Sequence, residues 1–143
     1  MSRPSDYSIE IASEICGRLS CGEPLVKICR SDEMPHVSTV YRWIAAYESF
    51  RDMYARARED QADTLADEIQ AIADEPMLGC KTVTKPNGDV EKTEGDMIEH
   101  RRLRVEARKW IAAKLKPKKY GEKIDHEHSG GVTVKMESAD ANA

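Results

Sequence analysis

Apolar residues in the first thirty positions recur at the spacing of short α-helices. The first helix is predicted from six of them, namely Ile9, Ile11, Ala12, Ile15, Cys16 and Leu19. Residues 20–22 break this pattern. Pro24 suits the first position of a second short helix, which we expect to run to Arg30. The chain therefore begins with two short amphipathic helices.

A third helix is predicted over residues 39–47, after a tight turn. Its apolar positions Val40, Trp43 and Ile44 form an i, i+3, i+4 stripe. Three short helices, the second and third joined by a turn, indicate a helix-turn-helix domain over residues 1–47. A small helical bundle without any role in DNA binding shows the same pattern, so both interpretations stay open at this point.

In a helix-turn-helix, the third helix presents its outer face to the major groove. Here that face holds four residues: Ser38, Thr39, Tyr41 and Arg42. Lys27 and Arg30 are expected near the phosphates, and Arg3 adds a cation in the N-terminal arm. These seven residues are the predicted DNA-binding positions.

The middle of the chain predicts two long helices. Residues 48–74 contain no Pro or Gly, and one stripe of this helix is apolar except for Gln61: Phe50, Tyr54, Ala57, Gln61, Leu65, Ile69 and Ile72. Residues 96–116 have two apolar stripes: Leu103, Ala107, Trp110 and Ile111 on one, and Ile98, Val105, Ala112 and Leu115 on the other. Apolar surface on two sides indicates burial against the same chain and against a neighbouring copy. We therefore expect an oligomerisation domain over residues 48–123.

Between these helices, residues 81–93 predict a β-hairpin. Asn87-Gly88 is a strong signal for a two-residue type I′ turn. That turn pairs Lys85 with Val90 and Val83 with Lys92, which places both valines on one face. Two valines do not hold a free-standing hairpin together, so it must pack on something or stay mobile.

The last segment, residues 124–143, predicts one short strand followed by a flexible tail. Val132, Val134 and Met136 alternate with polar residues. Equivalent strands from several subunits satisfy every edge by closing into a barrel. We therefore expect Val132 and Val134 to contribute to oligomerisation, with Tyr54, Leu65, Ile69, Leu103, Trp110 and Ile111.

Charge is unevenly distributed along the chain, whose net charge is −4. Residues 1–47 have a net charge of −1, residues 48–75 of −6 and residues 97–123 of +7. Opposite blocks attract one another, within a chain or between copies. The first domain has so few cations that one copy is expected to bind DNA non-specifically with an affinity no better than a Kd of roughly 10⁻⁴ to 10⁻⁶ M. DNA binding therefore requires many copies acting together.

Several classes of site are not expected. The four cysteines have no zinc-finger or CxxC spacing, and without a signal peptide they suggest free thiols in a reducing cytosol. No apolar run reaches the roughly 20 residues that cross a bilayer, so no membrane partner is expected. His126 and His128 have no third ligand nearby. We therefore predict no catalytic residue, metal site or cofactor.

Three runs of this sequence resemble the small terminase subunit of tailed double-stranded DNA bacteriophages. They are RPSDY near the start, STVYRWIAAYESFRDMYARARE after the second short helix, and RRLRVEARKWIAAKLKPKKYGEK toward the end. The resemblance covers residues 3–123. Its most specific part is Arg108-Lys109-Trp110 followed by PKKYG from Pro117 to Gly121.

This resemblance implies a mainly α-helical fold and a non-enzymatic function. Small terminases recognise the packaging initiation site on viral double-stranded DNA, and they recruit and regulate the large terminase, which holds the ATPase and nuclease. The family implies a homo-oligomeric ring of eight or more subunits in the host bacterial cytoplasm. Helix-turn-helix domains lie at its periphery, helical hairpins surround a channel, and C-terminal strands form an intersubunit β-barrel. The large subunit is expected to dock on the C-terminal tail.

Two features of this chain depart from the family pattern, and two other functions compete with it. The insertion at 81–93 is not shared by every member, and the tail is acidic where some relatives are basic. A phage or prophage helix-turn-helix transcription regulator acting as a dimer is the main alternative. A small nuclease or metal-dependent hydrolase is a weaker one, because the sequence contains neither a Walker loop nor HExxH.

Overall fold

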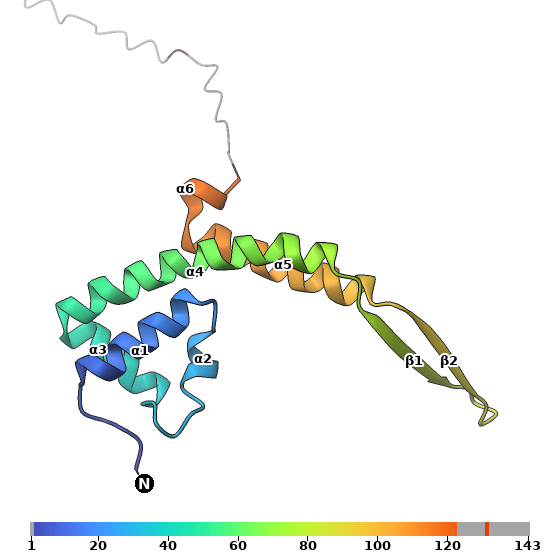
Figure 1. The fold of residues 1–143 in the computed structure, drawn as a ribbon, viewed down its shortest axis with the longest axis horizontal. Helices are drawn as coiled ribbons and strands as arrows, with labels where there is room; N and C mark the ends of the chain where they lie inside the picture. Colours follow the sequence, from blue (N-terminus) through green and yellow to red (C-terminus); the bar gives the residue numbers. More distant parts are fainter. Residues whose placement is uncertain (1, 123–130, 132–143) are drawn as a thin grey trace, which may run out of the picture.

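The computed structural model describes residues 2–122 and Gly131, and it is mainly helical with one two-stranded antiparallel hairpin, as predicted (Figure 1). The elements in chain order are α1 (Ile9–Ser20), α2 (Leu25–Ile28), α3 (Val37–Ala46), α4 (Glu48–Asp74), β1 (Leu78–Thr84), β2 (Val90–Asp96), α5 (Ile98–Leu115) and α6 (Pro117–Tyr120). The predicted C-terminal strand lies outside the described residues.

Helices α1 to α3 and the first half of α4 form the N-terminal helical unit, which encloses a closed apolar core. Ser8 caps α1 through a bond that its hydroxyl accepts from the Ile11 amide, and the His36 ring accepts from the Ser38 amide at the start of α3. The core consists of fully or nearly fully buried side chains: Ile15, Leu19, Leu25, Ile28, Met34, Val40, Trp43 and Phe50. Apolar burial thus holds four short segments together.

Aromatic side chains close one end of this core. The rings of Tyr7 and Trp43 meet edge to face with centroids 5.3 Å apart, and Tyr7 stacks on Tyr47 at 4.0 Å. Phe50 is the first large apolar residue of α4. Its ring meets that of Trp43 in a second edge-to-face contact, with centroids 6.2 Å apart. The start of α4 is thereby fixed to α3.

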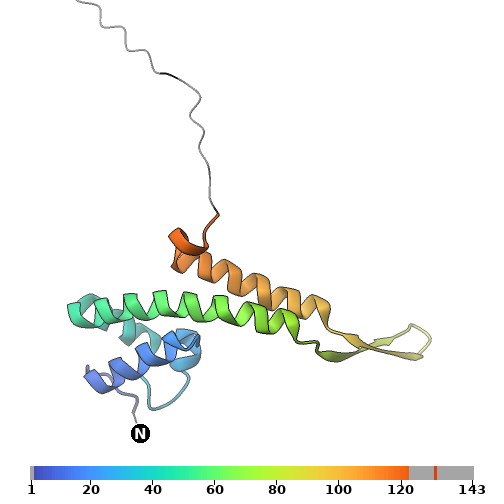
Figure 2. The same cartoon turned by 45° about the horizontal axis from the view of Figure 1, so that its top comes forward.

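Helix α4 changes partner along its length. Its first half contacts α1 and α3, whereas its second half packs antiparallel against α5 (Figures 1 and 2). Leu65 and Ile72 on α4 and Ala112 on α5 are buried where the two long helices meet. The β1–β2 hairpin extends beyond the end of this helical pair in both views. The long helices and the hairpin therefore form an arm that leaves the N-terminal helical unit.

The hairpin is present, but its predicted register is wrong by one residue. Thr84 pairs with Val90 and Val83 pairs with Glu91, so the two valines lie on opposite faces. Pro86 explains the shift, because a two-residue turn at Asn87-Gly88 needs a backbone N–H at position 86. The chain instead forms a three-residue loop in which Gly88 has a φ of +89° and donates to the Lys85 carbonyl at 2.9 Å.

Candidate nucleic-acid and subunit interfaces

The outer face of α3 is polar and open. Tyr41 is 56% exposed and Arg42 is exposed beside it, whereas Val40 and Trp43 on the opposite face are buried. Ser38 is exposed and Thr39 is partly exposed at the start of the helix, as the periodicity indicated. The four predicted α3 positions therefore lie together on one accessible surface.

The connection between α2 and α3 is not the predicted tight turn, although it is as long as the interval between the two predicted helices. It spans residues 29–36, whereas a helix-turn-helix typically uses three or four residues. Met34 and Pro35 in this connection are buried in the core. The predicted ends of these two helices were each wrong by two residues. Helix α2 ends at Ile28 rather than Arg30, and α3 begins at Val37 rather than Thr39.

Two of the predicted DNA-binding arginines hold the N-terminal arm in place. Arg3 Nη1 donates to the Cys29 carbonyl oxygen at 2.8 Å, and its Nη2 lies 3.6 Å from Asp32 Oδ1. Arg42 Nη2 donates to the Ser5 carbonyl oxygen at 3.3 Å. Both guanidinium groups nevertheless stay exposed, so the arm is held along the side of the unit that presents α3.

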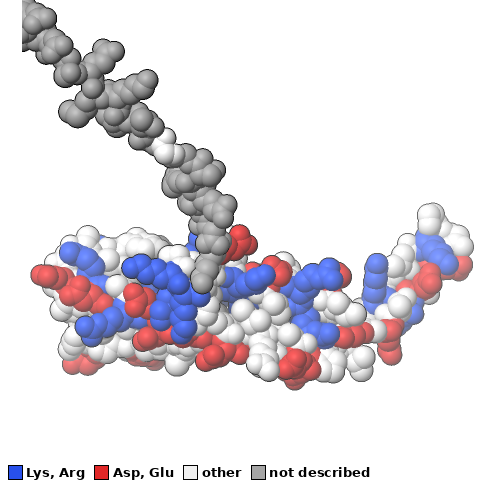
Figure 3. All heavy atoms as spheres, turned by 90° about the horizontal axis from the view of Figure 1, so that it is seen from above, with Lys and Arg blue, Asp and Glu red and all other residues white. Residues whose placement is uncertain are grey.

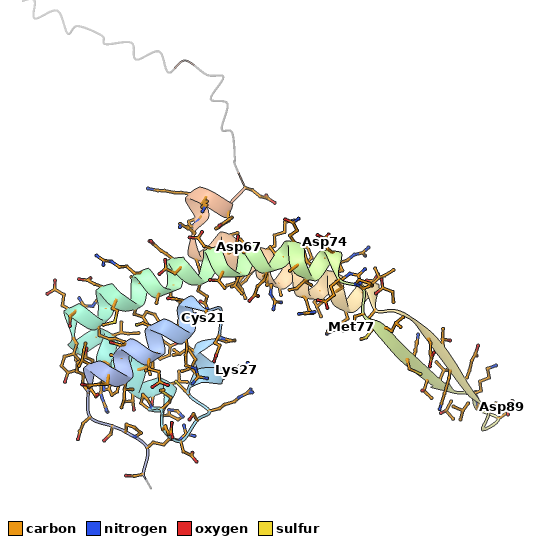
Figure 4. The ribbon with its side chains drawn as sticks, in the orientation of Figure 1. Cys21, Lys27, Asp67, Asp74, Met77 and Asp89 are labelled. Atoms are coloured by element: carbon orange, nitrogen blue, oxygen red, sulfur yellow. The ribbon has the colours of Figure 1, made fainter. Side chains whose placement is uncertain are left out.

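Lys27 and Arg30 are the most available cations of this surface. Both are exposed, and neither forms an ion pair with the residues that the structure describes; Figure 4 labels Lys27 on α2. The outer face of α3, the arm and these two cations together form one candidate DNA-binding surface. Its contacts are few, as the near-neutral charge of residues 1–47 indicated.

The acidic and basic blocks meet between the two long helices. Arg108 Nε donates to Glu68 Oε2 at 2.8 Å, which joins α5 to α4. Lys116 and Lys119 of the basic block likewise pair with Asp63 of α4, at 3.0 and 3.1 Å. Arg101 bonds Asp96 at the end of β2 with both terminal guanidinium nitrogens, at 2.6 and 2.9 Å, and its Nη1 also donates to the Glu75 carbonyl oxygen at 3.3 Å. The predicted attraction between the blocks is therefore used within the chain.

Asp63 forms a clasp between α4 and α6 that the sequence did not reveal. Its carboxylate accepts hydrogen bonds from Tyr120 Oη at 2.7 Å, Lys116 Nζ at 3.0 Å and Lys119 Nζ at 3.1 Å. These three hydrogen bonds hold the pKa of Asp63 well below its usual range, and the bond from Tyr120 has the largest effect. Asp63 is not part of the apolar stripe predicted for residues 48–74, and the PKKY run was the signal available for its partners.

The apolar positions predicted for oligomerisation divide into two groups. Tyr54 packs against the N-terminal core and Leu65 is buried, so both are used within their own chain; Ile69 is partly buried. On α5, the predicted stripe instead faces outward, with Leu103 67% and Trp110 64% exposed, and Ile111 is also exposed. Val132 and Val134 lie outside the described residues. The described residues 2–122 thus leave the Leu103–Trp110 side of α5 uncovered.

The described surface shows mixed charge. On the face seen from above, basic and acidic side chains are interspersed over the long helices (Figure 3). Within residues 2–122, no group of three His, Cys, Asp or Glu side chains is arranged to hold a metal ion, while His126 and His128 lie outside that range. Burial raises the pKa of the Cys16 thiol to about 11, which disfavours the reactive thiolate.

The fold thus combines an N-terminal helical unit that presents a small polar surface with an arm that presents an exposed apolar face. The family described as Bacteriophage Sf6, terminase small subunit-like matches residues 7–127, and this chain belongs to it. Family membership supports a role in viral DNA packaging and implies oligomerisation, with DNA and the large terminase as partners. Small terminase subunits are generally regulatory rather than enzymatic.

Solved structures support the same assignment. Two crystal structures of the terminase small subunit gp1 of the bacterial virus Sf6, each with one substitution, share 37% identity with this chain at a TM-score of 0.65. A third variant shares 36% identity at the same TM-score. Each alignment covers 96% of this chain and 97% of the other. A search of curated sequences found no significant match.

These comparisons do not favour the alternative of a dimeric transcription regulator. Among the described helices, none is both long enough and apolar enough to cross a membrane.

Proposed function

We propose that this chain is the DNA-recognition component of a phage packaging motor. It binds viral double-stranded DNA at the packaging initiation site, then recruits and regulates the large terminase with its ATPase and nuclease in the infected bacterium. The observation that supports this most strongly is the match to the small terminase family over residues 7–127, together with 37% identity to gp1 over nearly the whole chain.

The candidate DNA-binding surface supplies the recognition step in this proposal. Tyr41 and Arg42, with Ser38 and Thr39, face base edges from α3, while Lys27 and Arg30 contact phosphates. Residues 1–47 act as the DNA-binding domain. Arg3 positions the N-terminal arm through Cys29 and adds one cation to the surface.

Oligomerisation raises the affinity that one such surface cannot supply. Several copies that engage one DNA molecule convert later contacts into intramolecular ones, so avidity exceeds the affinity of a single domain. In the proposed assembly, residues 48–123 build a ring of eight or more subunits and residues 124–143 contribute strands to a barrel and dock the large subunit. The exposed Leu103 and Trp110 side chains support a subunit contact on α5.

Binding to viral DNA with matched variants tests this proposal. We expect the Lys27→Ala/Arg42→Ala double variant to bind viral DNA more weakly while keeping the wild-type oligomeric mass, because both side chains are exposed on helices without a substantial contact to α5. Lys92→Ala on the exposed hairpin is the control. Wild-type retardation of viral DNA by the double variant would contradict the placement of the surface, and loss of its oligomer would show an assembly role instead.

Recruitment is tested separately by the chain's capture of its cognate large subunit. We expect a stable complex with the full-length chain and loss of that complex after removal of residues 124–143. Unchanged capture by the shortened chain would contradict docking on this segment.

A further inference from the structure

Ion pairing within the chain leaves a row of acidic side chains on α4. Glu68 is paired with Arg108 and Asp63 with α6. Asp60, Asp67 and Asp74 are exposed and have no ion-pair partner among the described residues. They are seven residues apart, so they lie on one side of the helix at intervals of two turns; Asp67 and Asp74 are labelled along α4 in Figure 4.

The uncovered side of α5 has a matching seven-residue repeat. Leu103 and Trp110 are 67% and 64% exposed, whereas Ala112, on the side packed against α4, is 1% exposed. The residue before each of the two is basic and exposed, namely Arg102 and Lys109. The surface therefore repeats a cation followed by a large apolar side chain every two turns.

The cations of this repeat are only weakly held by their own helix. Arg102 Nη1 lies 3.4 Å from Oε1 of Glu99, three residues earlier. Lys109 Nζ lies 3.9 Å from Oε1 of Glu106, also three residues earlier. All four side chains are more than half exposed, and exposed pairs of this kind contribute about 0–1 kcal/mol. A neighbouring carboxylate can therefore replace these partners at little cost.

The contacts between α4 and α5 within one chain place the acidic repeat of α4 and the cationic repeat of α5 at the same positions along the helical pair. Arg108 bonds Glu68, and seven residues earlier Arg101 bonds the carbonyl of Glu75. Because the helices run antiparallel, the residue after each arginine on α5 lies at the same position along the pair as the residue before its partner on α4. Lys109 therefore corresponds to Asp67, and Arg102 corresponds to Asp74. Copies arranged side by side about an axis along the helical pair keep these levels. The two repeats then meet in register without any shift along the helices.

From this match we infer that the outer face of α5 docks onto the outer face of α4 in the next copy of the chain. Lys109 pairs with Asp67 and Arg102 with Asp74 of the neighbouring copy, while Leu103 and Trp110 pack on that helix near the small, exposed Ala71. This inference rests on the proposed oligomeric function and names the surfaces that build it.

The contact is heterologous, because a cationic and apolar face meets an acidic face rather than its own equivalent. A two-fold dimer through either face alone would place like charges opposite each other. Head-to-tail contacts of this kind propagate from copy to copy and close into a ring when the rotation permits. The charge pattern thus favours a ring over an isolated dimer.

Charge reversal on each face tests the contact, with oligomeric mass measured by light scattering after gel filtration. The Asp67→Lys/Asp74→Lys variant and the Arg102→Glu/Lys109→Glu variant should each fall toward the 16.1 kDa of a single chain. The chain with all four substitutions should regain the wild-type mass, and a 1:1 mixture of the two double variants should form mixed oligomers. The control is Asp52→Lys/Glu59→Lys, which makes the same charge change at exposed α4 positions of the same spacing.

Wild-type mass in both double variants would overturn this contact, and so would loss of assembly in the control. A fourfold variant that does not regain the wild-type mass, although its helical circular dichroism matches that of the wild type, would also overturn it. A wild-type chain that is itself monomeric would overturn the proposed oligomeric function. The two failures are therefore distinguishable.

Discussion

The two tryptophans of this chain mark two regions that differ in how they satisfy their apolar surface. Trp43 in the N-terminal helical unit is 2% exposed and is enclosed by aromatic neighbours, whereas Trp110 on α5 is 64% exposed. The first region completes its core within one chain. The second presents a large apolar side chain, with Lys114 Nζ 5.6 Å from the centroid of its ring.

This difference separates folding from assembly. A buried indole contributes to the stability of the single chain, while an exposed one of the same size contributes little until another molecule covers it. Substitutions in the two regions should therefore change different measurements: the free energy of unfolding for the N-terminal helical unit, and the mass of the assembly for α5.

The largest expected effect on folding is that of Trp43→Ala. Removal of this buried ring leaves a cavity beside Phe50, which should lower the free energy of unfolding by about 3–5 kcal/mol. Chemical denaturation followed by circular dichroism measures the loss. A change below about 1 kcal/mol would show that the aromatic core does not hold the N-terminal helical unit together.

Trp110→Ala should reverse this pattern. At low protein concentration, where single chains dominate, the free energy of unfolding should stay within about 0.5 kcal/mol of wild type, because the ring is mostly exposed. Assembly should weaken by about 2 kcal/mol or more per contact, as for an aromatic anchor at an interface. Sedimentation velocity over a concentration series measures this, and an unchanged distribution of masses would contradict a subunit contact at Trp110.

A smaller effect is expected for the DNA contacts of the N-terminal helical unit. Lys27→Ala should weaken binding to all DNA sequences alike, and it should reduce the slope of log K against log salt by about 1 for each subunit engaged. Fluorescence anisotropy at several salt concentrations gives this slope. A slope equal to that of wild type would place Lys27 away from the phosphates.

The smallest effect is expected at the Asp63 clasp, whose groups are partly exposed. Since hydrogen bonds hold the pKa of Asp63 below its ordinary value of 3.8, the clasp stabilises the folded chain above that pH and is lost as pH falls further. The NMR signals of the Tyr120 ring should therefore shift on acidification below pH 3.8, and Asp63→Asn should produce a shifted spectrum already at neutral pH. Asp60→Asn, one turn away, should leave these signals unchanged, and the same response in both variants would contradict a specific clasp.

The pattern of apolar residues along the sequence was sufficient to predict features that depend on a single helix. The i, i+3, i+4 stripe of Val40, Trp43 and Ile44 predicted which face of α3 is buried, and the lack of Pro and Gly predicted α4. Contacts between distant elements were not predictable in this way. Asp63 meets Tyr120, which is 57 positions away, and the hairpin register depends on the missing N–H of Pro86.

The predicted surfaces show the same limit. Periodicity identified the outer side of α3 because a single helix fixes it, but it could not show that Arg3 and Arg42 bond the backbone of other segments. It also grouped Leu65 with Trp110, although the packing of α4 buries the first and leaves the second exposed.

The most direct test of the account is the mass of the wild-type chain by native mass spectrometry at near-physiological salt. We propose that another copy of the chain covers the Leu103–Trp110 side of α5 and that assembly multiplies a weak DNA contact. We therefore expect a single closed species of eight or more copies of the 16.1 kDa chain. A species that remains a monomer or dimer across the working range of concentration would contradict it.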